Sequence, residues 1–261
     1  MKTIDYLIKQ LIDLITPVSS SNITINALFS LTLHSFAAYA PSIFCTYQAE
    51  KTLSSLLSQT FPLHFHSDLS ADEALAIADI LYLRQQYGLN VPVPSKTLLI
   101  NYLDNLLEEN NLMYCWLIGE LFNLLNIDVR LPEIKQKPRP YKNKNKVYDL
   151  YWLTHLIFLE TRYLHQPLLN TFTSEIIDLV GASNWIIATK HLDLAAEVAI
   201  CLDIAGKSHS KEYKHLIELL LANILTLTPI SNAEMDFDKM HTISVTLVAL
   251  VGFSEKCYSL K

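Results

Sequence analysis

Apolar residues recur every three to four positions in one segment after another of this chain, which is the periodicity of an amphipathic α-helix. Ser70, Ser95 and Ser210 each precede such a segment and are typical helix N-caps. Prolines in "YGLNVPVPS" and "NIDVRLPEIKQKPRP" interrupt the pattern, because proline lacks the amide hydrogen that a helix needs. We therefore expect helices near 3–15, 23–38, 47–58, 69–87, 95–108, 111–126, 147–164, 171–181, 190–205, 211–226 and 234–254.

The composition supports an entirely helical fold. Only five of the 261 residues are glycine, the residue that tight hairpins and phosphate-binding loops need. Hydrophobic residues make up 51% of the chain and charged residues 18%, which excludes a disordered protein. The sequence contains no GxGxxG, Walker, GxSxG or HExxH pattern. We expect an all-α fold in which helical hairpins stack into an α/α toroid-like or solenoid-like body.

Three segments resemble one another and favour stacked helical pairs. "DEALAIADIL" at 72–81, "GELFNLLNID" at 119–128 and "AEVAICLDIA" at 196–205 each begin near a glutamate and end with Asp or Asn followed by Ile. Each unit of a helical repeat buries its apolar face only against its neighbours. The spacings between the three segments are unequal, so chance similarity between apolar helices explains the pattern equally well.

One basic segment divides the chain. Residues 132–146, "PEIKQKPRPYKNKNK", hold three prolines and six Lys or Arg residues, which predicts an exposed loop or linker. It separates an amino-terminal helical part, 1–131, from a carboxy-terminal helical part, 147–261. The two parts fit two domains or two arcs of one body.

Charge and cysteine usage narrow the location and the partners. The whole chain has a net charge of −6, and outside this basic segment it is clearly acidic, so we expect no nucleic-acid partner. Cys45, Cys115, Cys201 and Cys257 show no CxxC spacing, which predicts reduced thiols. The amino terminus has no export signal, and the apolar runs are shorter than the roughly 20 residues that span a bilayer. We expect a cytoplasmic protein without membrane insertion.

The segment "YDLYWLTHLIFLETRYLHQPL", residues 148–168, carries polar residues on every face of a predicted helix. Tyr148, Tyr151, His155 and Arg162 share one stripe, while Thr154 lies on another. A helix without a polar face is covered by protein on most sides or borders a cleft. We expect this helix to be central.

A histidine beside tyrosines can exchange protons near neutral pH, which makes His155 a candidate general acid or base with Tyr151 orienting it. Glu120 and Glu197 lie within apolar helices, where a buried carboxylate is costly unless it is paired or protonated. A core histidine and a structural ion pair would give the same pattern. Candidate catalytic residues are His155, Tyr151 and Glu197; candidate binding residues are Thr154, Glu120, Arg162 and Tyr148.

Two short patterns contain metal-ligand types without completing a site. His64, His66 and Asp68 form an HxH followed by a carboxylate, but no further ligand is near in the sequence. Glu212 and His215 form one ExxH pair, whereas a helical di-iron site needs two. We expect no metal and no cofactor, and whether the HxH pattern binds a metal stays open.

The stretch around His155 resembles a group of uncharacterised all-helical bacterial proteins with a Tyr-x-Leu-Thr-His-x-x-Phe-like core. Tyr151, Leu153, Thr154, His155 and Phe158 carry the resemblance. Where that group favours an acidic residue after its second threonine, this chain has Arg162 and Tyr163. The resemblance implies a cytoplasmic helical protein of natural-product biosynthesis with no agreed activity.

Two functions fit these observations. The first is a helical binding or scaffold protein that engages a peptide or protein partner, as apolar helical grooves do, in a bacterial biosynthetic pathway. The second is an enzyme that uses no nucleotide and in which His155 acts as general acid or base in a cavity between helices. The sequence favours binding slightly, because it gives a better case for surfaces than for chemistry.

Overall fold

The structure is a computed structural model that describes residues 6, 9, 22–46, 49–59, 63, 65–131, 145–224 and 237–259. The described residues form α-helices, one short 3-10 helix and no strand, which confirms the predicted all-α fold. The elements are α2 (Ile23–Tyr39), α3 (Pro41–Thr46), α4 (Ala49–Leu57), α5 (Ala71–Gln86), α6 (Lys96–Glu108), α7 (Leu112–Leu124), α8 (Lys146–Glu160), η1 (Asn170–Phe172), α9 (Thr173–Thr189), α10 (Leu192–Ile204), α11 (Lys211–Asn223) and α12 (Phe237–Ser259).

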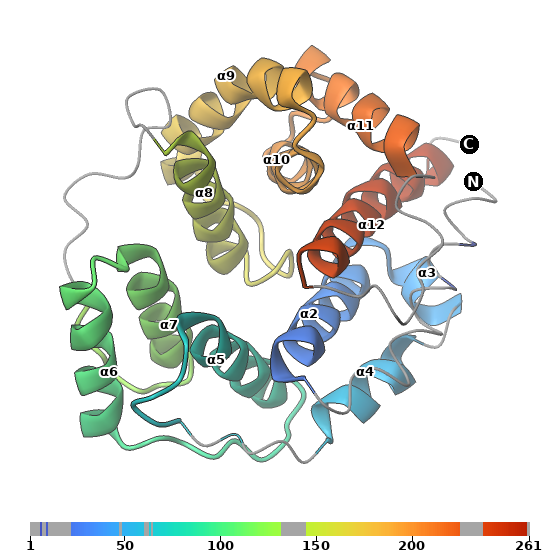
Figure 1. Ribbon diagram of the computed structural model, residues 1–261. Helices are drawn as coiled ribbons and strands as arrows, with labels where there is room; N and C mark the ends of the chain where they lie inside the picture. The colour runs from blue at the N-terminus through green and yellow to red at the C-terminus, as the bar shows by residue number, and fades with distance from the viewer. Residues whose placement is uncertain are drawn as a thin grey trace.

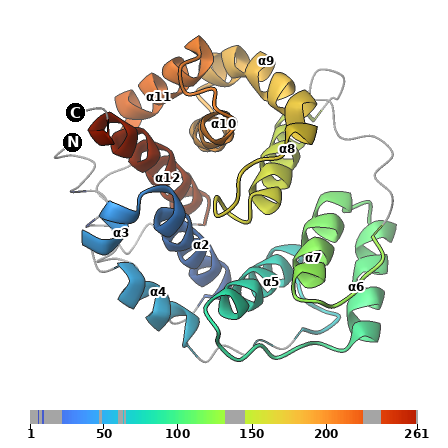
Figure 2. The same cartoon turned by 180° about the vertical axis from the view of Figure 1, so that it is seen from behind.

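The helices fall into an inner and an outer set (Figures 1 and 2). The inner helices α2, α5, α7, α8, α10 and α12 face the middle of the molecule, and α3, α4, α6, α9 and α11 lie outside them. The finer description as a toroid-like or solenoid-like body stays a prediction.

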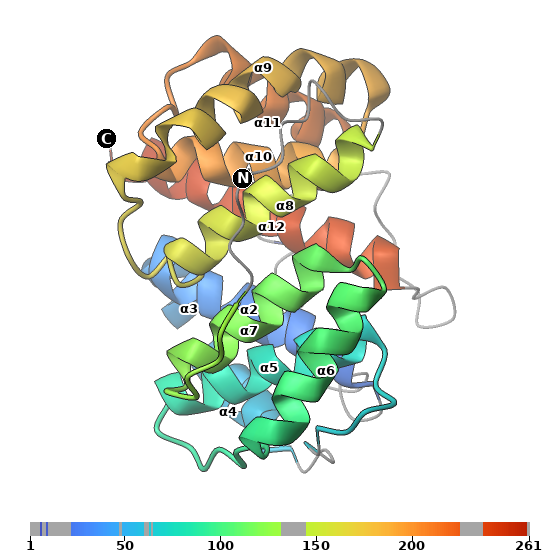
Figure 3. The same ribbon diagram turned by 90° about the vertical axis from the view of Figure 1, so that its left-hand side faces the viewer.

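Burial patterns explain the two sets. On the outer helix α6, Leu99, Tyr102, Leu103 and Leu106 form one buried stripe at helical spacing. On the inner helix α10, every residue from Leu194 to Asp203 is buried, so no face of this part of the helix meets solvent. A helix that is buried on every face must be enclosed by other elements. Helix α10 accordingly lies between α9, α11, α12 and α8 (Figure 3).

The two predicted parts of the chain pack against each other. Helix α2 of the amino-terminal part contacts α12 of the carboxy-terminal part, and α7 contacts α8. Of the basic segment 132–146 between them, residues 132–144 lie outside the described residues, as does most of the predicted helix near 3–15. Its last two residues, Asn145 and Lys146, are the N-cap and the first residue of α8. The three mutually similar segments fall on the inner helices α5, α7 and α10 and the turns after α7 and α10; their duplication stays a prediction.

Several helix ends follow the predicted signals. Ser70 forms a complete capping box with Glu73, and the hydroxyls of Ser95 and Ser210 accept backbone N–H groups at the starts of α6 and α11. Three predicted helix ends differ by four residues or more, and α3 was not predicted. Helix α9 continues to Thr189 instead of ending near 181, α8 ends at Glu160 instead of 164, and α12 continues to Ser259 instead of 254.

The early end of α8 coincides with a left-handed turn. Arg162, Tyr163 and Leu164 have φ values of 49°, 52° and 75°, so three consecutive non-glycine residues are left-handed. Thr161 supports the turn, because its hydroxyl donates to the Ile157 carbonyl and accepts the Leu164 N–H. Such residues cost about 1–2 kcal/mol each, so the turn requires stabilising contacts elsewhere.

In the described part of the chain, no helix is both long and apolar enough to cross a membrane.

Gly252 determines how closely α12 and α2 pack. A Cβ atom at Gly252 would overlap the ring of Tyr39, which ends α2. Because Gly252 is buried, the added methyl group cannot turn to solvent. The glycine therefore sets the distance between the first and last described helices.

We expect Gly252→Ala to lower the free energy of unfolding by about 1–3 kcal/mol, the usual cost of overpacking. Urea denaturation measures the loss. In a Tyr39→Ala background, Gly252→Ala should lower the free energy of unfolding much less than in the wild type, because the ring that the added methyl group overlaps is absent. An additive double variant would show that the Gly252–Tyr39 contact is not the cause.

Candidate functional site

Two adjoining chambers lie between the inner helices. The inner chamber has a volume of about 110 Å³, and its walls include Thr32, Ser35, Phe158, Ile200, Val245 and Val248. The outer chamber has a volume of about 590 Å³, and its walls include Thr24, Tyr114, Tyr148, His191 and Phe237. Leu31, Asp79, His155 and His241 line both chambers, so the two spaces meet at these side chains.

The amino-terminal halves of all six inner helices lie at the outer chamber. Each of the six contributes residues from its first half to the outer chamber, for example Thr24 of α2, Met113 of α7 and Phe237 of α12. The inner chamber is lined by residues further along α2, α8, α10 and α12. The outer chamber is therefore the amino-terminal end of a bundle of parallel inner helices.

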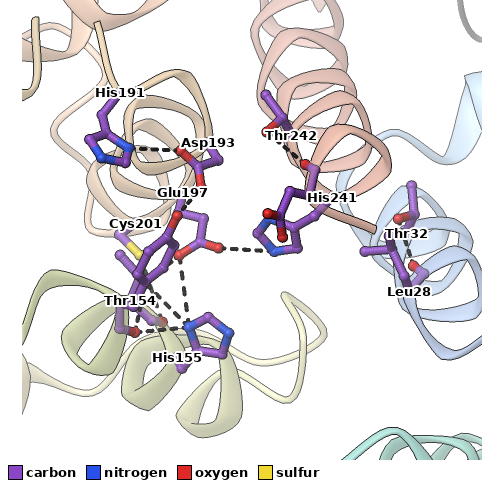
Figure 4. A network of polar contacts seen from close by, with 12 residues as sticks. Leu28, Thr32, Thr154, His155, His191, Asp193, Glu197, Cys201, His241 and Thr242 are labelled. Carbon is purple, nitrogen blue, oxygen red and sulfur yellow. Dashed lines mark hydrogen bonds and ion pairs between the residues drawn. The ribbon is translucent and has the colours of Figure 1, made fainter. Parts of the chain in front are cut away.

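His155 of α8 has one hydrogen-bonded nitrogen and one available nitrogen. Its Nδ1 lies 2.8 Å from the Tyr151 carbonyl oxygen, which can only accept, so Nδ1 carries the hydrogen of the neutral ring. The lone pair is then on Nε2, which points away from these contacts (Figure 4). Burial lowers the pKa of His155 to about 4. The side chain is 28% exposed, and it borders both chambers. His155 is thus a neutral base at neutral pH.

Glu197 of α10 is a fully buried carboxyl between α8 and α12. The Thr154 hydroxyl donates to its Oε2 over 2.5 Å, and Nδ1 of His155 lies 3.8 Å from the same oxygen. Its Oε1 lies 3.4 Å from Nε2 of His241 on α12 but accepts no hydrogen bond from a described residue. Burial raises the pKa of Glu197 to about 7; the His241 charge and the Thr154 hydrogen bond oppose this rise, and Asp193 adds to it. Glu197 therefore holds a proton over part of the neutral range.

A second polar group lies on the wall formed by α5. Asp79 is 5% exposed and borders both chambers, and its Oδ1 accepts the Tyr163 hydroxyl at 2.6 Å. Burial raises the pKa of Asp79 to about 7, while the Tyr163 hydrogen bond lowers it. Tyr163 belongs to the left-handed turn after α8, so this turn places its hydroxyl on Asp79. The cavity consequently has two carboxyls with raised pKa values.

The outer chamber has its own hydrogen-bonded groups. The Tyr151 hydroxyl donates to Asp193 at the start of α10, and His191 Nδ1 lies 3.1 Å from the same carboxylate. The Tyr114 hydroxyl donates to Asp72 at the start of α5. These contacts tie α8 to α10 and α7 to α5 at the end of the bundle where the chamber lies.

The structure brings most of the predicted site residues together. Tyr148, Tyr151 and His155 line the outer chamber, and Glu197 and Thr154 meet beside His155. Two others lie elsewhere and line neither chamber. Glu120 is half-buried, and burial together with Glu160 raises its pKa. Arg162 lies in the left-handed turn near Tyr82, where burial raises the pKa of Tyr82 and the Arg162 charge opposes this rise.

The sequence analysis did not single out His241, Asp79 or Tyr163 as site residues. Asp79 carries the same signal as Glu197, an acidic residue inside the apolar helix "EALAIADIL". His241 and Tyr163 lack a local signal, because their partners Glu197 and Asp79 are distant in the chain.

The HxH pattern adds nothing to this site. His66 and Asp68 are exposed, and His64 lies outside the described residues. Among the residues that the structure describes, no three His, Cys, Asp or Glu side chains gather as a metal site would require. Cys45, Cys115 and Cys201 are free thiols, and burial raises the pKa of Cys201 well above its usual range.

We expect Glu197→Gln to stabilise the protein at high pH. A carboxyl whose pKa rises from 4.5 to about 7 on folding contributes stability that is fully present below pH 4.5 and is lost as the pH rises through 7. Glutamine cannot ionise, so the variant should gain on the order of 3 kcal/mol over the wild type above pH 7 and little near pH 4.5. Urea denaturation at both pH values tests this, with the exposed Glu218→Gln as control. An equal difference at both pH values would contradict the buried, raised pKa.

We expect Tyr163→Phe to destabilise the protein by about 1–3 kcal/mol, because Asp79 then loses its hydrogen-bond donor inside the protein. The matched control is Tyr114→Phe, whose partner Asp72 is exposed and can be solvated instead. Thermal and urea unfolding compare the two. A loss no larger than that of Tyr114→Phe would mean that water already reaches Asp79.

Comparison of this chain with protein family models, with curated proteins and with solved structures found no match, so the geometry of the two chambers is the basis for assigning a function.

Proposed function

We propose that this protein is an enzyme that carries out proton transfer on a small, largely apolar organic molecule bound between the inner helices. The outer chamber, at about 590 Å³, lies within the range of roughly 300–1,000 Å³ that small-molecule sites occupy. The inner chamber has leucine, isoleucine and valine walls with a few convergent polar groups, which is the usual composition of such sites. The outer chamber adds tyrosine, histidine and aspartate side chains to its leucines.

One observation carries the proposal. His155 and Glu197 lie 3.8 Å apart, and their surroundings shift their pKa values in opposite directions, His155 down to about 4 and Glu197 up to about 7. A neutral imidazole next to a carboxyl that still holds a proton is a base beside an acid at the same pH. Enzymes that use general acid–base catalysis separate their two groups in this way.

The contacts suggest a role for each side chain. His155 Nε2 accepts a proton from the substrate, because Nδ1 is already bonded to the Tyr151 carbonyl. His241, which lines both chambers, returns a proton to another substrate atom and is reprotonated by Glu197, whose Oε1 faces it. Thr154 holds Glu197 in place through Oε2. One proton leaves the substrate and one is added, as in an isomerisation. Between turnovers His155 releases its proton to solvent and Glu197 regains one from solvent through His241, so no other reactant is consumed.

The peptide- or protein-binding function predicted from the sequence is the second candidate. The adjacent outer helices α9 and α11 expose Ile177 and Leu221, which are 63% and 40% accessible, and such residues suit a docking surface. A docking surface does not need a buried acid and base deep between helices, so we rank this function second.

A cytoplasmic location and a place in a biosynthetic pathway are further parts of the proposal. The free thiols support the cytoplasmic location.

Comparative metabolite profiling tests the enzyme proposal. Wild type, His155→Gln and the control His209→Gln, which changes an exposed histidine, are each incubated with an extract of small bacterial metabolites. We expect wild type and His209→Gln to deplete the same metabolite. His155→Gln should be slower by about 10²–10⁴-fold, the usual contribution of a general acid or base.

Circular dichroism and a urea midpoint establish that the variants are folded. If a metabolite is depleted equally by wild type and folded His155→Gln, the histidine is not the base. If no metabolite is depleted by the wild type under any condition, the enzyme proposal fails and the binding function takes its place.

A further inference from the structure

The charged residues that line the chambers are of one sign. Carboxyl side chains come from Asp72 and Asp79 of α5, Asp193 and Glu197 of α10 and Asp238 of α12. Within the described part of the chain, the two chambers have no lysine or arginine in their walls. Three histidines also line the chambers: His155 is neutral at neutral pH, and His191 and His241 lie against Asp193 and Glu197. A ligand that carries a negative charge would therefore be repelled.

Two of these carboxyls lie deep and retain hydrogen-bonding capacity. Glu197 is fully buried, and its Oε1 accepts no hydrogen bond from a described residue. Asp79 is 5% exposed, and Tyr163 is the one described residue that hydrogen-bonds it, through Oδ1. Asp72 and Asp193 at the chamber rim also each accept a tyrosine hydroxyl, but Asp72 is exposed and Asp193 half-buried. Of the two deep groups, Asp79 lies at the junction of the chambers, while Glu197 is engaged with Thr154 and His241.

Aromatic rings adjoin the deep carboxyl. Phe158 of α8 and Tyr163 both line the inner chamber together with Asp79. The left-handed backbone of Tyr163 keeps this ring and its hydroxyl at the chamber despite its conformational cost. A carboxylate with aromatic faces beside it is the combination that proteins use to bind organic cations.

The direction of the inner helices offers the opposite interpretation, because helix N-termini attract anions. Three of these six helices, α5, α10 and α12, carry an aspartate in the first turn, at Asp72, Asp193 and Asp238. These carboxylates already interact with the helix dipoles at the rim, and they face the outer chamber. The amino-terminal end is thus occupied by the protein's own anions, and the two histidines nearest to it, His191 and His241, already face the carboxyls of Asp193 and Glu197.

We propose that the ligand is a protonated amine on an apolar skeleton, with its ammonium group bound by Asp79 and its hydrocarbon part in the inner chamber. This inference rests on the proposed function and specifies the class of substrate. The apolar walls from Leu31, Ile200, Val245 and Val248 take the hydrocarbon. The ammonium group donates to the Asp79 oxygen that Tyr163 leaves available, within reach of the junction where His155 and His241 lie.

Matched sets of probes test the charge of the ligand. Each set has one linear alkyl or phenylalkyl skeleton that ends in an ammonium, a hydroxyl or a carboxylate group, and isothermal titration calorimetry measures the affinity for the full-length protein. We expect the amine to bind about tenfold or more tightly than the alcohol, equivalent to about 1.4 kcal/mol, and the carboxylate to bind weakest.

Asp79→Asn separates the charge from the shape of the site. Asparagine resembles the protonated carboxyl that the fold already accommodates, so this variant should remain folded. We expect it to remove the advantage of the amine while changing the affinity of the alcohol by less than threefold. Asp72→Asn, which alters a rim carboxylate, should retain most of the advantage.

The outcomes distinguish the two proposals. If the alcohol or the carboxylate binds as tightly as the amine, the amine class is wrong, whereas the enzyme proposal stands on the metabolite experiment. If Asp79→Asn leaves the preference for the amine unchanged, the assignment to Asp79 is wrong. If no probe of any length binds the wild type, both the amine class and the use of the cavity for small molecules are overturned.

Discussion

The buried carboxyl of Glu197 is the constraint on which the rest of the site depends. An ionisable group enclosed on every side is tolerated only when hydrogen bonds, charges or a retained proton offset its loss of water. Here the carboxyl is contacted by the Thr154 hydroxyl of α8 and the His241 imidazole of α12. The burial of Glu197 on α10 therefore depends on both helices packing against α10. The packing of α12 against α2 then places both helices in the walls of the two chambers that α8 and α10 also line.

Most of the helices could be predicted because helical periodicity and capping are local properties. The helix starts at Ser70, Ser95 and Ser210 can be recognised from three or four consecutive residues of sequence. In the structure, all three serines cap their helices. The end of α8 could not be predicted in this way. The sequence from Thr161 to Leu164 continues the apolar pattern, but its backbone becomes left-handed where Tyr163 reaches Asp79 on another helix. A tertiary contact decides that boundary, and no local pattern contains it.

The same distinction applies to the site. His155, Tyr151 and Thr154 share one helix, so their spacing alone places them together, and Glu197 attracts attention as an acidic residue in an apolar helix. Glu120 gives the same signal but lies half-buried near Glu160, because the pattern predicts burial without indicating which neighbour a side chain faces. His241 becomes part of the site only when α12 packs on α10. Its chain neighbours carry no information about Glu197.

The two deep carboxyls are difficult to explain as stabilising features. Apolar residues of similar size are often at least as stabilising as a buried charged group and its partner. A structural role would also favour complete hydrogen bonding, yet Oε1 of Glu197 accepts no hydrogen bond from the described residues, and the left-handed turn at Tyr163 adds a conformational cost. Local features that cost stability are typical of sites that bind or react. Because Glu197 and Asp79 adjoin the same inner chamber, the proposed function accounts for both costs together: we propose that one carboxyl supplies a proton and that the other holds the molecule that receives it.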